Sequence, residues 1–216
     1  LDVTSASAAA GTNVQTYTFN QSTAQKWTLL ETEKTLYSIM GKTNVSVSQM
    51  VKFYKNKATV SYPYSNVSEA PTIEKFCQIY KEESEVEGVK AEVAFAQAMM
   101  ETGFLKFGGD VKKDQYNFAG IGAIGGGSSG AKFDSIRIGI RAHVQHLKAY
   151  ASKEALKQPV VDPRFQYVKR GSAEYVQWLG QKENPNGYGL PIFSFRISIP
   201  SSSILAASST TGPRTS

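Results

Sequence analysis

The sequence predicts a mainly α domain (α+β class) with two lobes and a short β segment ahead of it. Three features indicate this class. Apolar residues recur at the three- and four-residue spacing of helices from about residue 40 to 189. A glycine-rich stretch, residues 104–133, interrupts the helical segments and is expected to form an irregular lobe. Residues 1–30 are instead rich in Thr, Ser, Asn and Gln, and the alternation in NVQTYTFN is typical of a strand.

Two helices are predicted in the first part of the helical region. Ser46 or Ser48 can cap a helix that continues through Tyr54. Pro71 suits the first turn of the next helix, because the N–H that proline lacks would have no partner there. Apolar residues of that helix are spaced i, i+3, i+4 and i+7 and are expected in the core: Ile73, Phe76, Cys77 and Tyr80.

Further helices are predicted on both sides of the glycine-rich lobe. KAEVAFAQAMMETG should be a buried helix, because its apolar side chains point in nearly every direction. Gly103 is expected to end that helix in the left-handed backbone region. Asp134 is predicted to be the N-cap of a long helix, SIRIGIRAHVQHLKAYAS, and SAEYVQWLGQKE, from Ser172, is predicted to form another.

Composition narrows the class of protein further. With 216 residues, 41% hydrophobic and 19% charged, the chain suits one globular core of ordinary size. No apolar run approaches the roughly 20 residues that a membrane-spanning helix needs. The net charge of +6 comes from scattered Lys and Arg, which argues against a nucleic-acid partner. Diffuse charge of this kind suits attraction to an anionic surface, or simply solubility.

Neither a metal nor an organic cofactor is expected. Cys77 is the single cysteine, which excludes an internal disulfide and a cysteine-based zinc site, and it is expected to be a small core residue. His143 and His146 lie three residues apart on a predicted helix, but no third ligand is near them in the sequence. The run GIGAIGGGSSG lacks the GK[ST] ending of a phosphate-binding loop.

Glu101 has the most unusual predicted surroundings. A carboxylate in the last turn of a helix faces the negative end of the helix dipole, and a buried helix removes water from around it. Both effects raise the pKa of the carboxyl group, so its protonated form is favoured near neutral pH. That is the form in which a general acid gives a proton to a leaving group. The alternative is an ordinary, solvent-exposed glutamate at a helix end.

Three segments together strongly resemble the glucosaminidase domain of family 73 glycoside hydrolases, in particular clostridial autolysins: AEVAFAQAMMETGFLKFGG, QYNFAGIGA and FDSIRIGIRAHVQHLKAYAS. The resemblance runs from about residue 43 to 189. It implies a lysozyme-like, mainly helical fold that cleaves the β-1,4 bond after N-acetylglucosamine in peptidoglycan. It also implies that Glu101 is the catalytic residue and that a saccharide groove is lined by Asn117, Phe118, Ala119, Gly120 and Ile121.

Further residues are candidates for substrate binding. Gln97, one helical turn before Glu101, either faces the groove or packs in the core through a hydrogen bond. Tyr188 is a candidate for stacking on sugar rings. Three other aromatic residues are weaker candidates of the same kind, because aromatic side chains more often serve in a core: Tyr116, Tyr175 and Trp178.

A second catalytic carboxylate is less clearly indicated. Asp110 and Asp114 are the only acidic residues between 104 and 133, and both also suit turns. Asp134 is better explained as a helix cap. The alternatives are assistance from the substrate's own acetamido group or a water molecule held by neutral groups.

The two ends of the chain differ from the central region. Residues 11–27, GTNVQTYTFNQSTAQKW, resemble the end of one ricin-type β-trefoil repeat, through a VQxYxxN strand and the QKW signature. Residues 1–30 are therefore expected to be the remnant of a carbohydrate-binding module; alternatively, Trp27 simply anchors a strand. After residue 189, LPIFSFRISIP replaces the aromatic-Ala-Thr-Asp motif and closing helix that the resemblance implies. Residues 190–216 are expected to form a loose tail.

These patterns predict a peptidoglycan hydrolase domain, residues 40–189, that acts as a monomer on glycan strands at the cell-wall surface. The first residues lack the features of a signal peptide and the chain begins at Leu1, so we expect a piece of a longer, secreted product. Two alternatives remain open. One is a non-catalytic peptidoglycan-binding module with an impaired C-terminus, and the other is an N-acetylmuramidase.

Overall fold

The structure, a computed structural model, describes residues 2–3, 14–15, 36–123 and 130–179. Its contacts divide the chain into two units, Leu1–Thr35 and Leu36–Ser216. The elements in chain order are β1 (Asp2–Val3), β2 (Val14–Gln15), α1 (Val47–Lys57), α2 (Ile73–Glu87), α3 (Ala91–Glu101), the 3₁₀ turn η3 (Lys113–Gln115), α4 (Ile136–Ala151), and the 3₁₀ turns η4 (Phe165–Tyr167) and η5 (Val176–Trp178).

The first unit contains one short antiparallel strand pair. β1 pairs with β2, so that Asp2 lies opposite Gln15 and Val3 opposite Val14. β2 falls within the segment predicted to be a strand. The rest of the predicted lectin remnant, including Trp27, lies outside the described residues, as does the whole of the predicted tail.

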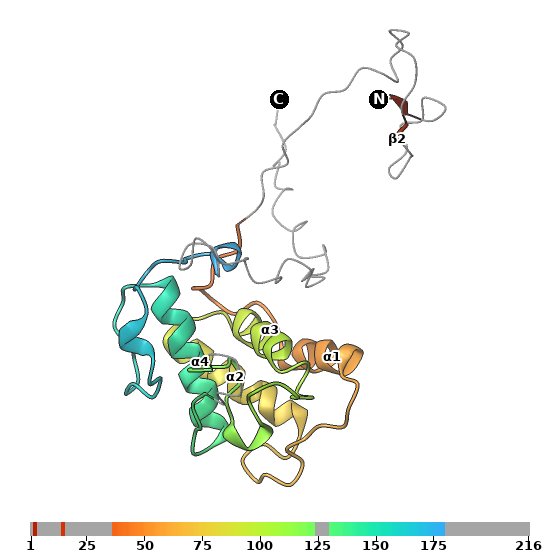
Figure 1. The fold of residues 1–216 in the computed structure, drawn as a ribbon, viewed down its shortest axis with the longest axis vertical. Helices are drawn as coiled ribbons and strands as arrows, with labels where there is room; N and C mark the ends of the chain where they lie inside the picture. Colours follow the sequence, from red (N-terminus) through yellow and green to blue (C-terminus); the bar gives the residue numbers. More distant parts are fainter. Residues whose placement is uncertain (1, 4–13, 16–35, 124–129, 180–216) are drawn as a thin grey trace, which may run out of the picture. The chain divides into compact units, whose positions relative to one another are not determined.

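The second unit is a helical domain, and the prediction of a mainly α fold is confirmed. α2 lies in the middle and packs against α1, α3 and α4 (Figure 1). Ring contacts join α2 to a loop and to α3: the ring centroids are 5.1 Å apart for Phe76 and Phe118, and 5.6 Å apart for Tyr80 and Phe95. These aromatic side chains are all buried, and burial of rings of this size contributes strongly to the stability of a domain.

The starts of α1 and α2 follow from their capping residues. Of the two serines predicted as caps, Ser46 caps α1, and its hydroxyl accepts a hydrogen bond from the Gln49 backbone N–H. The N-cap of α2 is Thr72, whose Oγ1 accepts from Lys75 N at 3.2 Å. The prediction that Pro71 lies in the first turn is therefore wrong, because Thr72 provides a side-chain oxygen and the helix begins after it.

The N-cap of α4 is Ser135, and the prediction of Asp134 is wrong. The Ser135 Oγ accepts from Ile138 N at 3.3 Å and donates to Glu69 Oε1 at 3.1 Å. A hydroxyl can do both, whereas an ionised Asp134 carboxylate could only accept. Asp134 itself is exposed.

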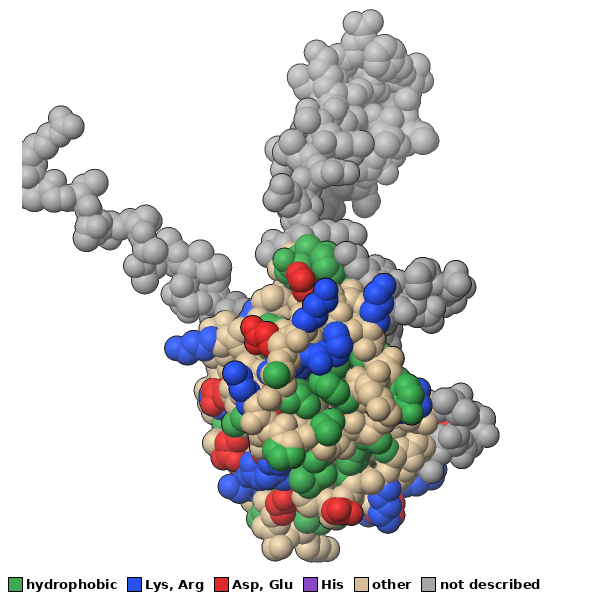
Figure 2. All heavy atoms as spheres, turned by 90° about the vertical axis from the view of Figure 1, so that its left-hand side faces the viewer, with side chains coloured by type: hydrophobic (Ala, Val, Ile, Leu, Met, Phe, Trp, Pro, Cys, Tyr) green, Lys and Arg blue, Asp and Glu red, His purple; other side chains and the backbone are tan. Residues whose placement is uncertain are grey.

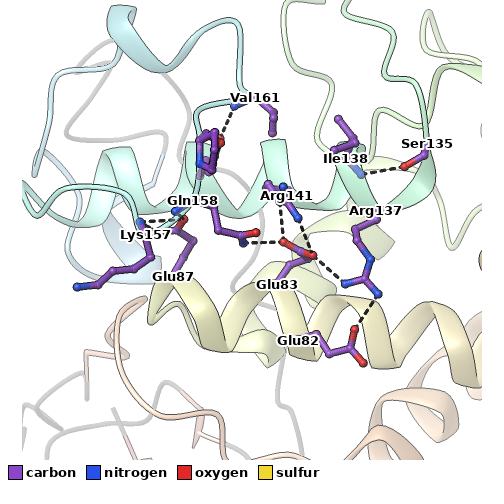
Figure 3. A network of polar contacts seen from close by, with 12 residues as sticks. Glu82, Glu83, Glu87, Ser135, Arg137, Ile138, Arg141, Lys157, Gln158 and Val161 are labelled. Atoms are coloured by element: carbon purple, nitrogen blue, oxygen red, sulfur yellow. Dashed lines mark hydrogen bonds and ion pairs between the residues drawn. The ribbon is translucent and has the colours of Figure 1, made fainter.

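Charged side chains hold α4 along α2 (Figure 3). Glu83 of α2 accepts from Arg137 Nη1 at 2.8 Å and from Arg141 Nε at 2.9 Å, both on α4. One to two turns farther on, the Lys148 ammonium lies 2.9 Å from a Glu87 carboxylate oxygen, and both side chains are 0% exposed. Buried charges of this kind require partners, so this network fixes the register of the two helices.

The helix predicted from Ser172 is not formed within the part of the chain that the structure describes. Backbone groups there bond instead to an earlier segment: Ile39 N donates to Glu174 O at 3.0 Å and Val176 N donates to Tyr37 O at 2.9 Å. Up to residue 179, where the described part ends, this segment forms one 3₁₀ turn, η5. Backbone groups of this segment therefore form hydrogen bonds with residues 37–39 in place of the hydrogen bonds of a helix.

Basic residues are scattered over the surface that Figure 2 shows, as the sequence predicts. On the face drawn in Figure 2, Lys and Arg side chains are spread among Asp and Glu side chains, around an area of hydrophobic and neutral polar ones. Among the helices placed by the structure, none is long and apolar enough to cross a membrane.

Candidate active site

Helix α3 is buried over most of its length and opens to solvent only near its C-terminal end. Its buried positions include Glu92, Phe95 and Met99. The partly or fully exposed positions are Gln97, Met100 and Glu101. Their spacing of three and four residues places Met100 and Glu101 on the same helix face as Gln97. A small accessible surface is thus built on an otherwise rigid core helix.

Glu101 is the last residue of α3, as predicted. Its side chain is accessible to solvent, yet the protein packed around the helix end reduces its hydration and raises its pKa. Among the described residues it makes no hydrogen bond or ion pair. An accessible carboxyl group that holds its proton to a higher pH than usual is suited to proton donation.

The chain reverses sharply just after Glu101. Gly103, Phe104 and Leu105 adopt φ angles of 58°, 58° and 62°, which form a short left-handed turn. Gly103 ends α3 in this region, as predicted. A left-handed conformation costs a residue with a side chain roughly 1–2 kcal/mol. Such strain persists only where the surroundings impose it, and it is concentrated at functional sites.

Thr102 is the residue that imposes this turn. Its Oγ1 donates to Ala98 O at 2.7 Å and accepts from Leu105 N at 3.0 Å. Phe104 N donates to Met99 O at 2.6 Å, and the Leu105 side chain is 1% exposed. The backbone that carries Glu101 is therefore fixed by buried contacts on both sides.

Gln97 is joined to the core through His143. The Gln97 Oε1 lies 3.0 Å from His143 Nε2, and His143 Nδ1 lies 3.1 Å from the hydroxyl of Tyr80. Burial lowers the pKa of His143 to about 3. Gln97 is partly exposed, so the structure combines the two predicted arrangements: one end of the amide packs inward while the side chain remains accessible.

His146 has a different partner from His143. Its Nδ1 lies 2.7 Å from Asp162 Oδ2, and Asp162 is buried. In the described ranges, no group of three or more His, Cys, Asp or Glu side chains is arranged to hold a metal ion.

The segment 117–121 forms a turn whose side chains face mainly inward. Asn117 donates to Ile121 O at 2.9 Å and to Ala131 O at 3.0 Å, while its Oδ1 accepts from Ile121 N at 2.9 Å. Asn117 is 1% exposed and Phe118 is 0% exposed. Their side chains therefore lie in the interior, contrary to the expectation that they line a groove, because the amide is occupied in holding the loop.

The accessible part of this turn is Ala119 and Gly120, which are partly exposed. Gly120 has a φ of 63°. Contacts between this loop and a saccharide would therefore involve the small residues and the backbone that Asn117 positions.

The two candidates for a second carboxylate are both at the surface. Asp114, in η3, is exposed and forms an ion pair with Lys132, with 3.4 Å between Nζ and Oδ2. Asp110 is partly exposed. No hydrogen bond or ion pair in the described residues links either one to Glu101. Tyr188 lies outside the described residues.

Two polar contacts of the helices that build this region were not predicted from the sequence. Glu92 lies in the first turn of α3 and accepts from Tyr37 OH at 2.8 Å and from Asn44 N at 3.3 Å. It lies nine residues before Glu101, about 13 Å along the helix, and it anchors the segment before α1 rather than the site. Tyr80 was recognised only as a core residue, and nothing in the local sequence indicated its bond to His143.

Comparisons with known proteins identify the family of the chain. The sequence model of the family "Glucosaminidase: Mannosyl-glycoprotein endo-beta-N-acetylglucosaminidase" matches residues 77–189. A protein of Borreliella burgdorferi described as uncharacterized is 54% identical over 97 residues, which are 45% of this chain and 48% of that relative. The chain thus spans about half the length of the curated relative. No solved structure matches the chain. Because the family match covers just over half of the sequence, the chain belongs to the glucosaminidase family of glycoside hydrolases.

Proposed function

We propose that the chain is a peptidoglycan hydrolase of the endo-β-N-acetylglucosaminidase kind, with Glu101 as its general acid. The observation that carries this proposal is the position of Glu101: it is accessible, it has a raised pKa, and it ends a buried helix inside the family-matched region. A helix-end glutamate that is fully solvated would instead keep the ordinary pKa of a glutamate carboxyl group, about 4.3.

In the proposed reaction, the Glu101 carboxyl group gives its proton to the glycosidic oxygen as the bond from that oxygen to C1 of N-acetylglucosamine breaks. The developing positive charge on C1 is met by a nucleophile, and water supplies the hydroxyl of the new reducing end. The nucleophilic assistance comes from Asp110 or Asp114, from the acetamido oxygen of the substrate, or from a water held by neutral groups.

Substrate contacts are proposed for Gln97, for the turn at Ala119 and Gly120, and for Tyr188. Asn117 and Phe118 would then act by positioning this turn from the interior. The diffuse positive charge of the chain suits approach to the anionic cell wall. We accordingly propose a secreted monomer whose catalytic domain spans residues 40–189, with residues 1–30 the remnant of a lectin repeat and 190–216 a loose tail.

Digestion of purified peptidoglycan tests both activity and choice of bond. The products would be reduced with borohydride, and the sugar at the new reducing end identified by mass spectrometry. Reduced N-acetylglucosamine is the expected product. Reduced N-acetylmuramic acid would establish a muramidase instead. Binding to cell walls without any new reducing ends would indicate a non-catalytic module, and the unusual sequence after residue 189 would be the first cause to examine.

A further inference from the structure

We propose that His143 and Tyr80 are positioning residues that hold the Gln97 amide with its NH₂ group directed outward, beside Glu101, as a donor to an acceptor oxygen of the saccharide. This inference rests on the proposed function of Glu101. It concerns residues that touch no substrate themselves and act only through Gln97.

The three side chains form one chain of hydrogen bonds that runs from the core to the surface. The Tyr80 hydroxyl, on α2, lies 3.1 Å from His143 Nδ1, on α4, and His143 Nε2 lies 3.0 Å from Gln97 Oε1, on α3. Tyr80 is 0% exposed and His143 is 1% exposed, whereas Gln97 is partly accessible. Three helices thus contribute one group each.

The direction of every hydrogen bond in this chain follows from the atoms involved. Gln97 Oε1 carries no hydrogen, so His143 Nε2 must be the donor. Because burial lowers the pKa of His143 to about 3, the ring is neutral and carries that single N–H. Nδ1 is then an acceptor, and the Tyr80 hydroxyl donates to it. Burial raises the pKa of Tyr80 far above its usual value, so the hydroxyl retains its proton.

The orientation of the Gln97 amide has a consequence for the site. With its oxygen occupied by His143, the accessible end of the side chain is the NH₂ group. No hydrogen bond of this NH₂ group is formed within the described residues. Gln97 precedes Glu101 by four residues, which places the two side chains on one helix face, about 6 Å apart along the axis. A ligand oxygen near Glu101 would therefore meet a donor that is already oriented.

A glutamine without this constraint would rotate and present either its oxygen or its NH₂ group. Fixing one of these orientations has a cost in conformational entropy. Because His143 orients the amide in advance, this cost does not have to be met when the saccharide binds. Since the donor would contact the saccharide in both the ground state and the transition state, its loss should raise KM and leave kcat almost unchanged. One hydrogen bond of about 0.5–1.5 kcal/mol corresponds to roughly a 2- to 12-fold change.

Kinetics of the full chain on soluble peptidoglycan fragments test the positioning role. His143→Leu and Gln97→Leu should each raise KM within this range, and the double variant should be no worse than either single one, because both remove the same interaction. His143→Gln should restore KM, since its amide NH₂ can occupy the place of the imidazole Nε2–H. His146→Leu, on the same helix, is the control and should lower thermal stability without changing KM.

A second measurement is independent of turnover. The ¹⁵N shifts of the His143 ring in the full chain should report a protonated Nε2 and a bare Nδ1. Adding N-acetylglucosamine tetrasaccharide to Glu101→Gln should shift the Gln97 side-chain amide resonances, and this shift should be lost in the Glu101→Gln, His143→Leu double variant. If the wild-type protein cleaves no peptidoglycan, the proposed function is wrong. The His143 ring shifts and the Gln97 amide shifts then still test the positioning role, because neither requires turnover.

Three results would overturn the positioning role. The first is an Nδ1-protonated ring. The second is a KM that His143→Leu leaves unchanged although Gln97→Leu raises it. The third is a failure of His143→Gln to restore KM while that variant melts at the wild-type temperature.

Discussion

Gly139 of α4 lies so close to the backbone of Tyr116 that a β-carbon at position 139 would stand 1.8 Å from the Tyr116 carbonyl oxygen. Carbon and oxygen that are not bonded do not approach to such a distance. Tyr116 itself has a φ of 50° and immediately precedes Asn117. The absence of a side chain at Gly139 therefore lets the loop that leads to the proposed groove rest directly on α4.

Gly139→Ala is accordingly expected to destabilise the fold strongly, although alanine normally favours a helix. The methyl group must displace the Tyr116 backbone, at a cost of at least the 1–3 kcal/mol typical of overpacking. Urea denaturation of the full chain would measure the change in free energy of unfolding. Gly109→Ala is the matched control, because nothing lies within 4 Å of a β-carbon there. Stabilisation by Gly139→Ala would show that the close approach is not real.

The buried pair of Lys148 and Glu87 gives a second prediction. Lys148→Met should lower the free energy of unfolding by about 3–5 kcal/mol, since Glu87 would remain buried without its cation. Replacing both residues with methionine should recover part of this loss. For comparison, Lys55→Met removes an exposed pair with Glu74 and should cost less than about 1 kcal/mol. Equal effects of the two single variants would contradict the buried network.

The raised pKa of Glu101 makes a prediction about stability and pH. The folded protein holds this proton to a higher pH than the unfolded chain does, so stability is lost as the pH rises from the usual glutamate pKa, about 4.3, through the raised pKa of Glu101. Glu101→Gln lacks this titration. It should be more stable than wild type near neutral pH, and the difference should vanish below about pH 4.

Glu82→Gln is the control of opposite sign. Hydrogen bonding to Arg137 lowers the pKa of Glu82, so its contribution to stability is present above the usual glutamate pKa and is lost as the pH falls through its lowered pKa. This variant should be less stable than wild type at neutral pH, with a deficit that shrinks on acidification. Urea denaturation across the acid range measures both. A Glu101→Gln curve parallel to that of wild type at every pH would show that Glu101 is fully hydrated.

The sequence predicted best those features that depend on neighbouring residues. The apolar surface all around α3 and the glycine at 103 were enough to place Glu101 at the end of a buried helix. The mainly helical class followed from the same periodicity. Ser46 was one of two serines predicted to cap α1, and its capping partner Gln49 lies only three residues away.

Features that depend on distant residues were missed or misplaced. Ser135, and not Asp134, is the cap of α4 partly because its hydroxyl also donates to Glu69, 66 residues earlier. The segment after Ser172 pairs with residues 37–39 instead of forming a helix. The inward orientation of Asn117 depends on Ala131 across the loop. Likewise, the orientation of Gln97 depends on two other helices, which no local pattern reveals.

The assignment of Glu101 as general acid is tested most directly by the rate at which Glu101→Gln releases new reducing ends from purified peptidoglycan. Glutamine retains the size of the side chain but has no proton to transfer. General acid catalysis typically contributes about 10²–10⁴-fold, so kcat should fall by that factor while sedimentation with intact cell walls changes little. Asp110→Asn and Asp114→Asn should cost less if neither provides the second catalytic group. A Glu101→Gln protein that is folded and releases reducing ends at the wild-type rate would contradict the assignment.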